Sequence, residues 1–313
     1  MRHSILGLHH VTATVDEAQP DLDFCRRRLG LRLVKRTVNF DNHSVYHFYY
    51  GNETGEPGTI WTTFPYHAWG VPEGVHGAGQ VVATAFSIPG GTLQQWRSRL
   101  RDAGLDARTG LPRFDECPLV VRDPSGLVIE LVEGAADPRA PWSEGGFSPD
   151  MAIRGLHGVT LLLRERGPTI ALMTGVLGFD IVEETPERTR LAVGGTAAGH
   201  LVDLVEAPDA AQARNGLGTV HHVAFAIAST DEQLELRREL IRLGASPTEV
   251  RDRTYFQSIY FREPGGVLFE VATVSPGFTV DEPLAQLGET LRLPPWEEPH
   301  RAEIERTLPP IAD

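Results

Sequence analysis

The chain has 313 residues, which is enough for two domains or for one large domain. Apolar residues make up 41% and charged residues 23% of it, as is ordinary for a globular protein that works in water. Its formal net charge of -13 makes nucleic acid and anionic membrane surfaces unfavourable partners, because like charges repel. No segment approaches the ~20 consecutive apolar residues that cross a bilayer. We therefore expect neither a nucleic-acid partner nor a membrane partner.

The two cysteines, Cys25 and Cys117, are too few for a disulfide framework and are typical of a reducing compartment. Residues 1–4 lead directly into a predicted strand, without an apolar signal segment. We therefore expect a cytoplasmic protein and interpret both cysteines as structural.

The first predicted unit begins with a strand over 7–15 and a helix over 19–29. Three further strands follow over 30–37, 45–51 and 59–65, and aromatic and β-branched residues are frequent in them. The unit therefore reads strand, helix, strand, strand, strand.

The same order of elements recurs along the chain, which marks an internal repeat. The second unit opens with a strand over 80–89, continues with a helix over 92–103 and closes with a strand over 123–130. A segment rich in Gly, Ala, Pro and Ser follows over 134–149 and is the best domain boundary.

The third unit opens at 153–160, in a near-copy of the first strand, and closes at 199–204. The fourth opens at 218–227, has a helix over 231–243 and closes at 263–271. The first unit resembles the third most closely and the second resembles the fourth, as expected from a duplication of a duplication. We therefore predict an α+β fold made of four βαβββ modules.

These modules divide the chain into two predicted domains and a tail. The N-terminal pair of modules covers 1–135, the C-terminal pair covers 150–275, and a proline-rich tail follows over 276–313. We expect one short helix in the tail, over 283–291.

Paired histidines mark the opening strands of the first and fourth modules, and His10 and His222 fall at the same repeat position. Glu270 lies in an otherwise apolar closing strand, where a buried carboxylate is costly unless it is paired or bound to a metal. Two histidines and one carboxylate with open coordination positions suit non-haem Fe(II). Mn(II) and Zn(II) accept the same ligands. We therefore predict a metal site formed by His10, His222 and Glu270.

The other modules lack this set. Ala83 and Gly158 occupy the histidine position in the second and third modules. The position of Glu270 is held elsewhere by Glu130, by Asp203, and by Thr62 or Thr63. A complete set therefore requires the first and fourth modules to share one site, whereas pairing the third with the fourth would offer His222, Glu270 and Asp203.

Four segments carry a resemblance to a known family: His-His-Val-Thr at 9–12, the strand at 33–38, the aromatic run at 46–50, and Pro-Gly-Thr-Ile-Trp at 57–61 with its continuation to 65. Together with the four modules, they resemble the hydroquinone-type ring-cleaving dioxygenases of the vicinal oxygen chelate superfamily. The resemblance implies paired, curved, mixed β-sheets with helices outside and a metal held between paired modules.

The resemblance also implies further site residues, which here are His9, His221, Thr12, Arg253 and Tyr260. Strand alternation places Thr12 on the same face as His10. It directs His9 and His221 to the opposite face unless a bulge redirects them. Arg253 and Tyr260 would hold a bound phenolate, and His221 is our first choice for moving protons.

The predicted function is Fe(II)-dependent opening of hydroquinone-type, para-diol aromatic rings, with a small aromatic diol and O2 as reactants. The alternatives are an extradiol catechol dioxygenase, a non-redox glyoxalase-type metalloenzyme, and a protein that binds a small aromatic without turnover. Trp61, Phe225 and Phe269 would line the pocket or belong to the core. Paired sheets without disulfides favour a homo-oligomer.

Overall fold

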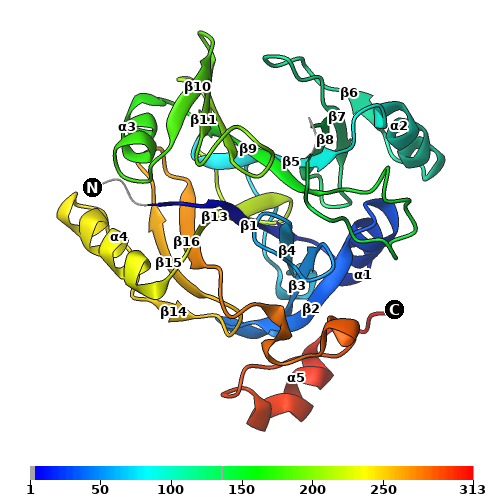
Figure 1. Ribbon diagram of the computed structural model, residues 1–313. Helices are drawn as coiled ribbons and strands as arrows, with labels where there is room; N and C mark the ends of the chain where they lie inside the picture. The colour runs from blue at the N-terminus through cyan, green and yellow to red at the C-terminus, as the bar shows by residue number, and fades with distance from the viewer. Residues whose placement is uncertain (1–3, 135–136, 313) are drawn as a thin grey trace.

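The computed structural model describes residues 4–134 and 137–312. They form two eight-stranded mixed sheets that pack against each other, with helices around the outside (Figure 1). Within these residues, no helix combines the length and the apolar character needed to cross a membrane. The predicted α+β class with curved, mixed sheets is confirmed.

The first sheet joins the first and fourth modules in the order β14-β15-β16-β13-β1-β4-β3-β2. Its strands are β1 (Gly7–Val15), β2 (Arg32–Asn39), β3 (Asn42–Gly51), β4 (Ile60–Pro65), β13 (Thr219–Ile227), β14 (Arg251–Asp252), β15 (Gln257–Arg262) and β16 (Leu268–Thr273). At its centre β1 pairs with β13 in antiparallel orientation, while β4 and β16 run parallel to their respective partners β1 and β13. The expected pairing of the first and fourth modules is confirmed.

The second sheet joins the second and third modules in the order β10-β11-β12-β9-β5-β8-β7-β6. Its strands are β5 (Gln80–Ile88), β6 (Arg108–Thr109), β7 (Leu119–Arg122), β8 (Val128–Glu133), β9 (Gly155–Leu163), β10 (Asp180–Glu184), β11 (Arg188–Ala192) and β12 (Leu201–Glu206). The predicted domains 1–135 and 150–275 therefore each contribute one module to each sheet, so the sheets do not follow the division of the sequence at the linker.

One helix accompanies each module: α1 (Ala18–Asp23, continued as a π-helix over Phe24–Arg28), α2 (Leu93–Asp102), α3 (Gly167–Gly175) and α4 (Thr230–Arg242). Helix α4 begins where Ser229 Oγ accepts a hydrogen bond from the Glu232 backbone amide, which satisfies one of the free amides of the first turn. Leu236 and Leu240 on α4 are fully buried and lie four residues apart, so one face of this helix packs on the sheet.

The main hydrophobic core lies between the sheets, where β13 packs against β5 and β1 against β9. The ring of Trp61 contacts that of Phe86, and Phe225 contacts both Phe179 and Phe269. All five rings are buried in this core. Trp61, Phe225 and Phe269 are therefore core residues and do not line the pocket.

The tail differs from its prediction. A helix over 283–291 was expected, but only a 3-10 turn at Leu284–Gln286 forms there, and the helix of the tail is α5 (Arg301–Thr307). Gly288 has a φ of 79°, and its Cα lies so close to Leu33 that an added Cβ would be 2.0 Å from the Leu33 carbonyl oxygen. The tail instead runs along the edge strand β2, where Leu291 forms a parallel bridge with Arg36. It thereby covers a sheet edge that would otherwise be open.

Three other 3-10 segments lie at His67–Trp69, Phe278–Val280 and Glu298–His300.

The tail is anchored by Lys35, whose buried ammonium lies 2.6 Å from Asp281 and also contacts Glu282. Phe278 adds an apolar anchor, because its ring packs on Tyr49 and Tyr255. These contacts connect the tail to the first sheet next to the site described below.

Candidate metal centre

A β-bulge in each central strand of the first sheet places two successive histidines on one face. Leu8 pairs with Phe225 and His10 with Ala224, so His9 is the unpaired residue of β1. The register skips His221 of β13 in the same way, between Thr12–His222 and Ala13–Val220 pairs. A bulge turns an extra side chain toward the face of its neighbour. Strict alternation predicts that His9 and His221 point away from the face of His10 and His222, but the bulges turn them to the same face.

Three side chains from β1, β13 and β16 converge at the centre of this sheet. His10 Nε2 lies 3.2 Å from Glu270 Oε2, and His222 Nε2 lies 2.8 Å from the same oxygen. The two Nε2 atoms are 3.2 Å apart. All three side chains are buried, and their ligand atoms form a compact group able to hold a metal ion. For bonds of ~2.1 Å, neighbouring ligands on one face of an octahedron are ~3.0 Å apart, which matches this triangle.

The histidine pairs set the protonation of the ligand candidates. His9 Nδ1 lies 2.8 Å from His10 Nδ1, and His221 Nδ1 lies 2.8 Å from His222 Nδ1. Burial, followed by the charge of His10, lowers the pKa of His9 to about 3, and the His9 ring also donates to the Thr273 backbone carbonyl. A neutral His9 that donates in this direction must accept at Nδ1, so His10 donates from Nδ1 and keeps a lone pair on Nε2.

Burial and then the charge of His222 lower the pKa of His221 to about 3, so His221 is neutral as well. If His222 offers its Nε2 lone pair to a metal, its own proton lies on Nδ1 and is donated to His221 Nδ1. Burial alone would raise the pKa of Glu270, but His10 and His222 hold it well below its usual range. Ser258 Oγ donates a hydrogen bond to Glu270 Oε1 and fixes the carboxylate. Two imidazole lone pairs and one carboxylate oxygen thus fit a divalent cation.

Arg253 and Tyr260 form a polar pair beside the triad. Arg253 Nε donates to the Tyr260 hydroxyl oxygen over 3.1 Å, and Arg253 Nη2 donates to Asp41 Oδ2 over 3.0 Å. The ring of Tyr260 lies 5.7 Å from that of His222. Burial and then the charge of Glu270 raise the pKa of Tyr260, so its phenol stays protonated and can donate.

Thr12 reaches the site indirectly. Its Oγ1 lies 2.8 Å from Thr62 Oγ1, which in turn lies 2.8 Å from His47 Nε2. His47, Asp41 and Ser258 were not predicted as site residues. Alternation within β3 could have identified His47, because it shares a face with Tyr49. Nothing local in the sequence marks Asp41, whose partner Arg253 is 212 residues away.

A cavity of about 180 Å³ lies over the triad. The fourth module lines it with His221, His222, Arg253, Phe256, Tyr260 and Glu270. The first module contributes His10, the aromatic rings of Phe40, Tyr49, Phe64 and Tyr66, and the polar side chains of Asn39, Asp41 and His47. An apolar cavity of ~150 Å³ accommodates benzene in an engineered protein core, so this cavity has room for a single aromatic ring.

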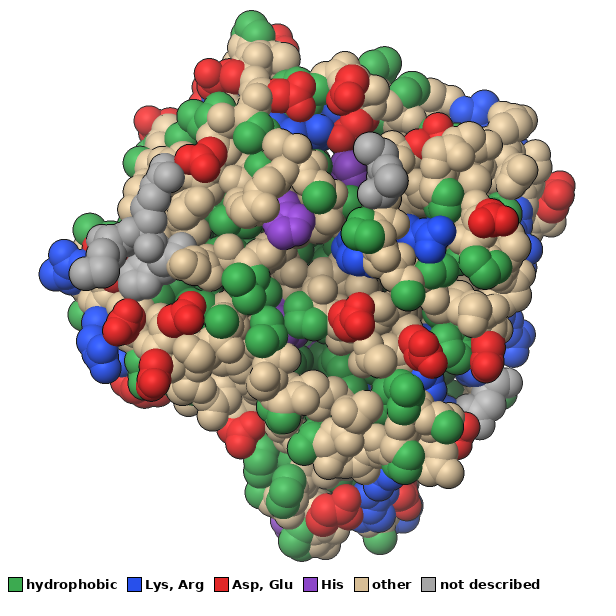
Figure 2. Space-filling view, viewed as in Figure 1, with side chains coloured by type: hydrophobic (Ala, Val, Ile, Leu, Met, Phe, Trp, Pro, Cys, Tyr) green, Lys and Arg blue, Asp and Glu red, His purple; other side chains and the backbone are tan. Residues whose placement is uncertain are grey.

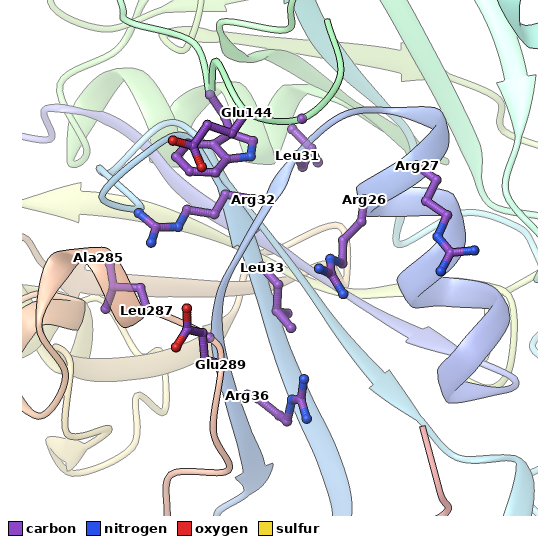
Figure 3. Close-up of a pocket in the computed structure, with 13 residues that line it drawn as sticks. Arg26, Arg27, Leu31, Arg32, Leu33, Arg36, Glu144, Ala285, Leu287 and Glu289 are labelled. Atoms are coloured by element: carbon purple, nitrogen blue, oxygen red, sulfur yellow. The ribbon is translucent and has the colours of Figure 1, made fainter. Parts of the chain in front are cut away.

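A larger groove of about 810 Å³ lies on the outer side of β2, between the linker and the tail (Figure 3). Arg26, Arg27, Arg32 and Arg36 line it together with Glu144 and Glu289. The guanidinium of Arg32 already donates to two backbone carbonyls and stacks on the Trp142 ring. The surface in Figure 2 likewise shows acidic and basic side chains intermixed over the face in view. The groove lacks the histidines of the metal site, so the smaller cavity is the candidate active site.

The equivalent position in the second sheet is closed by ion pairs. In the register, Asp203 lies opposite Thr160 and Glu130 opposite Ala85, just as Glu270 lies opposite Ala224. Arg190 binds Asp203, Arg113 binds Glu130, and the two carboxylates are thereby neutralised without a metal. Only about 10 Å³ of space remains there. Pairing of Asp203 with His222 is therefore wrong, because the two residues belong to different sheets.

The model of the Glyoxalase/Bleomycin resistance protein/Dioxygenase superfamily matches residues 159–271. MhqO of Bacillus subtilis, whose name assigns it provisionally to the ring-cleaving dioxygenases, is 41% identical over 99% of this chain and 98% of its own. The chlorohydroquinone/hydroquinone 1,2-dioxygenase of Sphingobium indicum is 36% identical over 96% of this chain and 95% of its own.

Solved structures agree with this assignment. A provisionally named dioxygenase from Bacillus subtilis superposes with a TM-score of 0.94 at 41% identity, over 99% of this chain and 98% of the other. Glyoxalase I from Zea mays shares the fold alone, with a TM-score of 0.64 at 13% identity over 86% of this chain and 92% of its own. The family implies a divalent metal, and the triad fits one. The chain therefore belongs to the Glyoxalase/Bleomycin resistance protein/Dioxygenase superfamily, within its ring-cleaving dioxygenases.

Proposed function

We propose that the chain uses Fe(II), held by His10, His222 and Glu270, to open hydroquinone-type para-diol rings with O2. The observation that carries the proposal is the convergence of the three ligand atoms, 2.8 to 3.2 Å apart, beneath a cavity with room for one aromatic ring. The hydroquinone dioxygenase of Sphingobium indicum, which matches nearly the whole chain, supports the para-diol substrate.

The donor set supports the choice of metal. Two neutral imidazoles and one carboxylate on one face leave open positions, which suits Fe(II) in oxygen chemistry. When bound, Fe(II) would acidify a phenolic hydroxyl and supply the redox chemistry that the reaction of O2 with the ring requires. Mn(II) and Zn(II) can occupy the same ligands, so oxygen uptake is measured on protein loaded with Fe(II).

Arg253 and Tyr260 bind the substrate oxygen that faces the triad. Both side chains line the cavity, and Tyr260 is paired with Glu270 across β15 and β16. Asp41 holds the guanidinium of Arg253, so the positive charge is fixed before a substrate enters. Fixed donors of this kind stabilise negative charge that develops on a ring oxygen.

The two outer histidines have different roles in this proposal. His221 lines the cavity, and when His222 holds the metal through Nε2, the His222 Nδ1–H donates to His221 Nδ1 and leaves the His221 proton on Nε2. This N–H can donate a hydrogen bond to an oxygen of the substrate or of the ring-opened product. His9 is 2% exposed and makes an edge-to-face contact with Phe256, so it orients His10 and stays away from the substrate. Thr12 acts through Thr62 on His47.

The closest alternative is an extradiol dioxygenase acting on catechols, which would use the same triad. The glyoxalase-type alternative expects a second carboxylate among the ligands. In the part of the chain that the structure describes, the buried group of potential ligands contains Glu270 as its single carboxylate. This donor set favours the dioxygenase over the isomerase.

Oxygen uptake tests the proposal. Protein loaded anaerobically with Fe(II) is mixed with air-saturated buffer and hydroquinone, and then with catechol. We expect one O2 consumed per hydroquinone, with the ring-opened acid identified by mass spectrometry, and no uptake by His222→Ala. Uptake with catechol alone would assign the chain to the extradiol alternative. If Fe(II)-loaded protein consumes no O2 with either diol, the proposal of a dioxygenase is refuted.

A further inference from the structure

The wall of the cavity that faces the triad comes from β3 of the first module. Tyr49 pairs with Thr62, Thr62 with Thr12, and Thr12 with His222, so a straight row of partners crosses four strands. Three strand spacings separate Tyr49 from His222, or ~14 Å along the sheet. His47 lies two residues before Tyr49 and on the same face. His47 and Tyr49 thus line the same cavity as the triad, from the end of the row that lies away from His222.

The ring of His47 is held in place by its neighbours. Its centroid is 4.0 Å from that of Tyr49 and 4.3 Å from that of Phe64. Its Nε2 lies 2.8 Å from Thr62 Oγ1. Within residues 4–134 and 137–312, this is the one hydrogen bond of the His47 side chain. The other ring nitrogen, Nδ1, has no protein partner there and is not fully buried. Nδ1 is therefore accessible from the cavity.

Two other polar residues on this wall, Asn39 and Asp41, already have partners. Asn39 Nδ2 donates to the Tyr66 hydroxyl oxygen over 2.8 Å. Asp41 accepts hydrogen bonds from Arg253 and Arg251. His47 thus offers a polar atom that a ligand can use, and the hydroxyl of Tyr49, whose ring contacts that of His47, offers another.

The threonines behind His47 leave it free to donate or to accept. A hydroxyl can take either role, so Thr62 can donate to His47 Nε2 or accept from it, with Thr12 adjusting in turn. His47 can therefore carry its single proton on either ring nitrogen without breaking the chain of hydrogen bonds. Its Nδ1 suits a ring hydroxyl, which can both donate and accept.

We propose that His47 Nδ1 binds the ring hydroxyl that lies para to the metal-bound oxygen, and so makes the site selective for para-diols. The inference rests on the proposed function and names the residue that distinguishes its substrate from a catechol. In a para-diol the second hydroxyl points across the cavity, away from the triad. In a catechol both hydroxyls lie on the same side of the ring, so His47 would face a C–H group.

A matched pair of variants tests this role. The side-chain amide of His47→Asn places a polar group near the position of Nδ1, whereas that of His47→Gln places one near Nε2 and retains only the contact with Thr62. Dissociation constants for hydroquinone, phenol and catechol are measured anaerobically by equilibrium dialysis on Fe(II)-loaded protein. Metal content and thermal unfolding of each variant are recorded to confirm an intact site.

We expect the wild type to bind hydroquinone about tenfold more tightly than phenol, which is the effect of one hydrogen bond. His47→Gln should lose this preference while its affinities for phenol and catechol stay unchanged, and His47→Asn should retain it. An unchanged preference in His47→Gln would overturn the inference, as would an equal loss for all three ligands. Loss of the preference in Tyr49→Phe alone would assign the role to Tyr49 instead.

Oxygen uptake tests the proposed function, and the binding assay on the His47 variants tests the inference about His47. Wild-type oxygen uptake with hydroquinone, together with a preference that does not depend on His47, would refute only the inference. Absence of uptake with any diol would refute the dioxygenase proposal, whatever the variants show in the binding assay.

Discussion

Lys35 is the only lysine of the chain, and replacing it with methionine should release the tail from the first sheet. Its side chain is fully buried, and its ammonium joins Asp281 and Glu282 of the tail. Glu282 is 2% exposed, so removal of the ammonium leaves a buried carboxylate without its main partner. Breaking a buried ion pair from one side costs about 3 to 5 kcal/mol.

The lower end of that range applies here, because Arg292 Nε lies 3.2 Å from Glu282 Oε1 and still offers a positive charge. A loss of about 3 kcal/mol corresponds to a decrease in Tm of roughly 5 °C for a protein of this size. Arg27→Met is the matched control, because its ion pair with Asp23 is exposed and contributes less than about 1 kcal/mol. Scanning calorimetry of the two variants and the wild type gives the comparison.

Amine acylation with peptide mass spectrometry provides a second readout. Because the chain has a single lysine, modification of its ε-amine in the wild type reports directly on opening of the tail. We expect slow labelling of Lys35, accelerated in a variant that removes the apolar anchor, Phe278→Ala. A Tm for Lys35→Met equal to that of Arg27→Met, or rapid labelling of native Lys35, would refute the anchoring role.

Two other predictions concern the site and the core. Asp41→Asn should lower kcat/KM about 2- to 5-fold with little change in Tm, because an exposed carboxylate that positions Arg253 contributes less than about 1 kcal/mol. Steady-state oxygen uptake measures kcat/KM, and a loss above about 100-fold would contradict this prediction. Burial raises the pKa of Asp21 to about 6 from 3.8, so its contribution to stability is full below pH 3.8 and is lost as the pH rises through about 6. The free energy of unfolding of Asp21→Asn should therefore rise by about 2 kcal/mol relative to that of the wild type between pH 4 and pH 7.5, as measured by urea unfolding. A difference that does not depend on pH would refute this.

The repeat explains how the sequence could predict the convergence of His10, His222 and Glu270 but not their surroundings. Duplicated modules place equivalent residues at equivalent sheet positions, and the register confirms Thr62, Glu130 and Asp203 as the counterparts of Glu270. Strand alternation alone placed His9 on the wrong face, because a bulge shifts the alternation by one residue and leaves no compositional mark.

Contacts between distant segments account for the remaining errors. Asp41 forms an ion pair with Arg253 because the first and fourth modules share a sheet. The sequence around a charged turn residue is the same whether or not the fold brings it such a partner. One short helix is predicted over 283–291, but pairing with the open edge of β2 stabilises an extended segment there. Tertiary contacts outweigh weak helix propensity in a segment of this length.

Metal stoichiometry in two equivalent glutamate variants tests the central claim most directly. Glu270→Gln and Glu130→Gln make the same substitution at corresponding positions of the two sheets. After anaerobic loading with Fe(II) and gel filtration, we expect about one iron per chain in the wild type and in Glu130→Gln, and a loss of at least tenfold in affinity in Glu270→Gln. Equal iron binding by all three proteins, or a selective loss in Glu130→Gln, would contradict a metal centre at His10, His222 and Glu270.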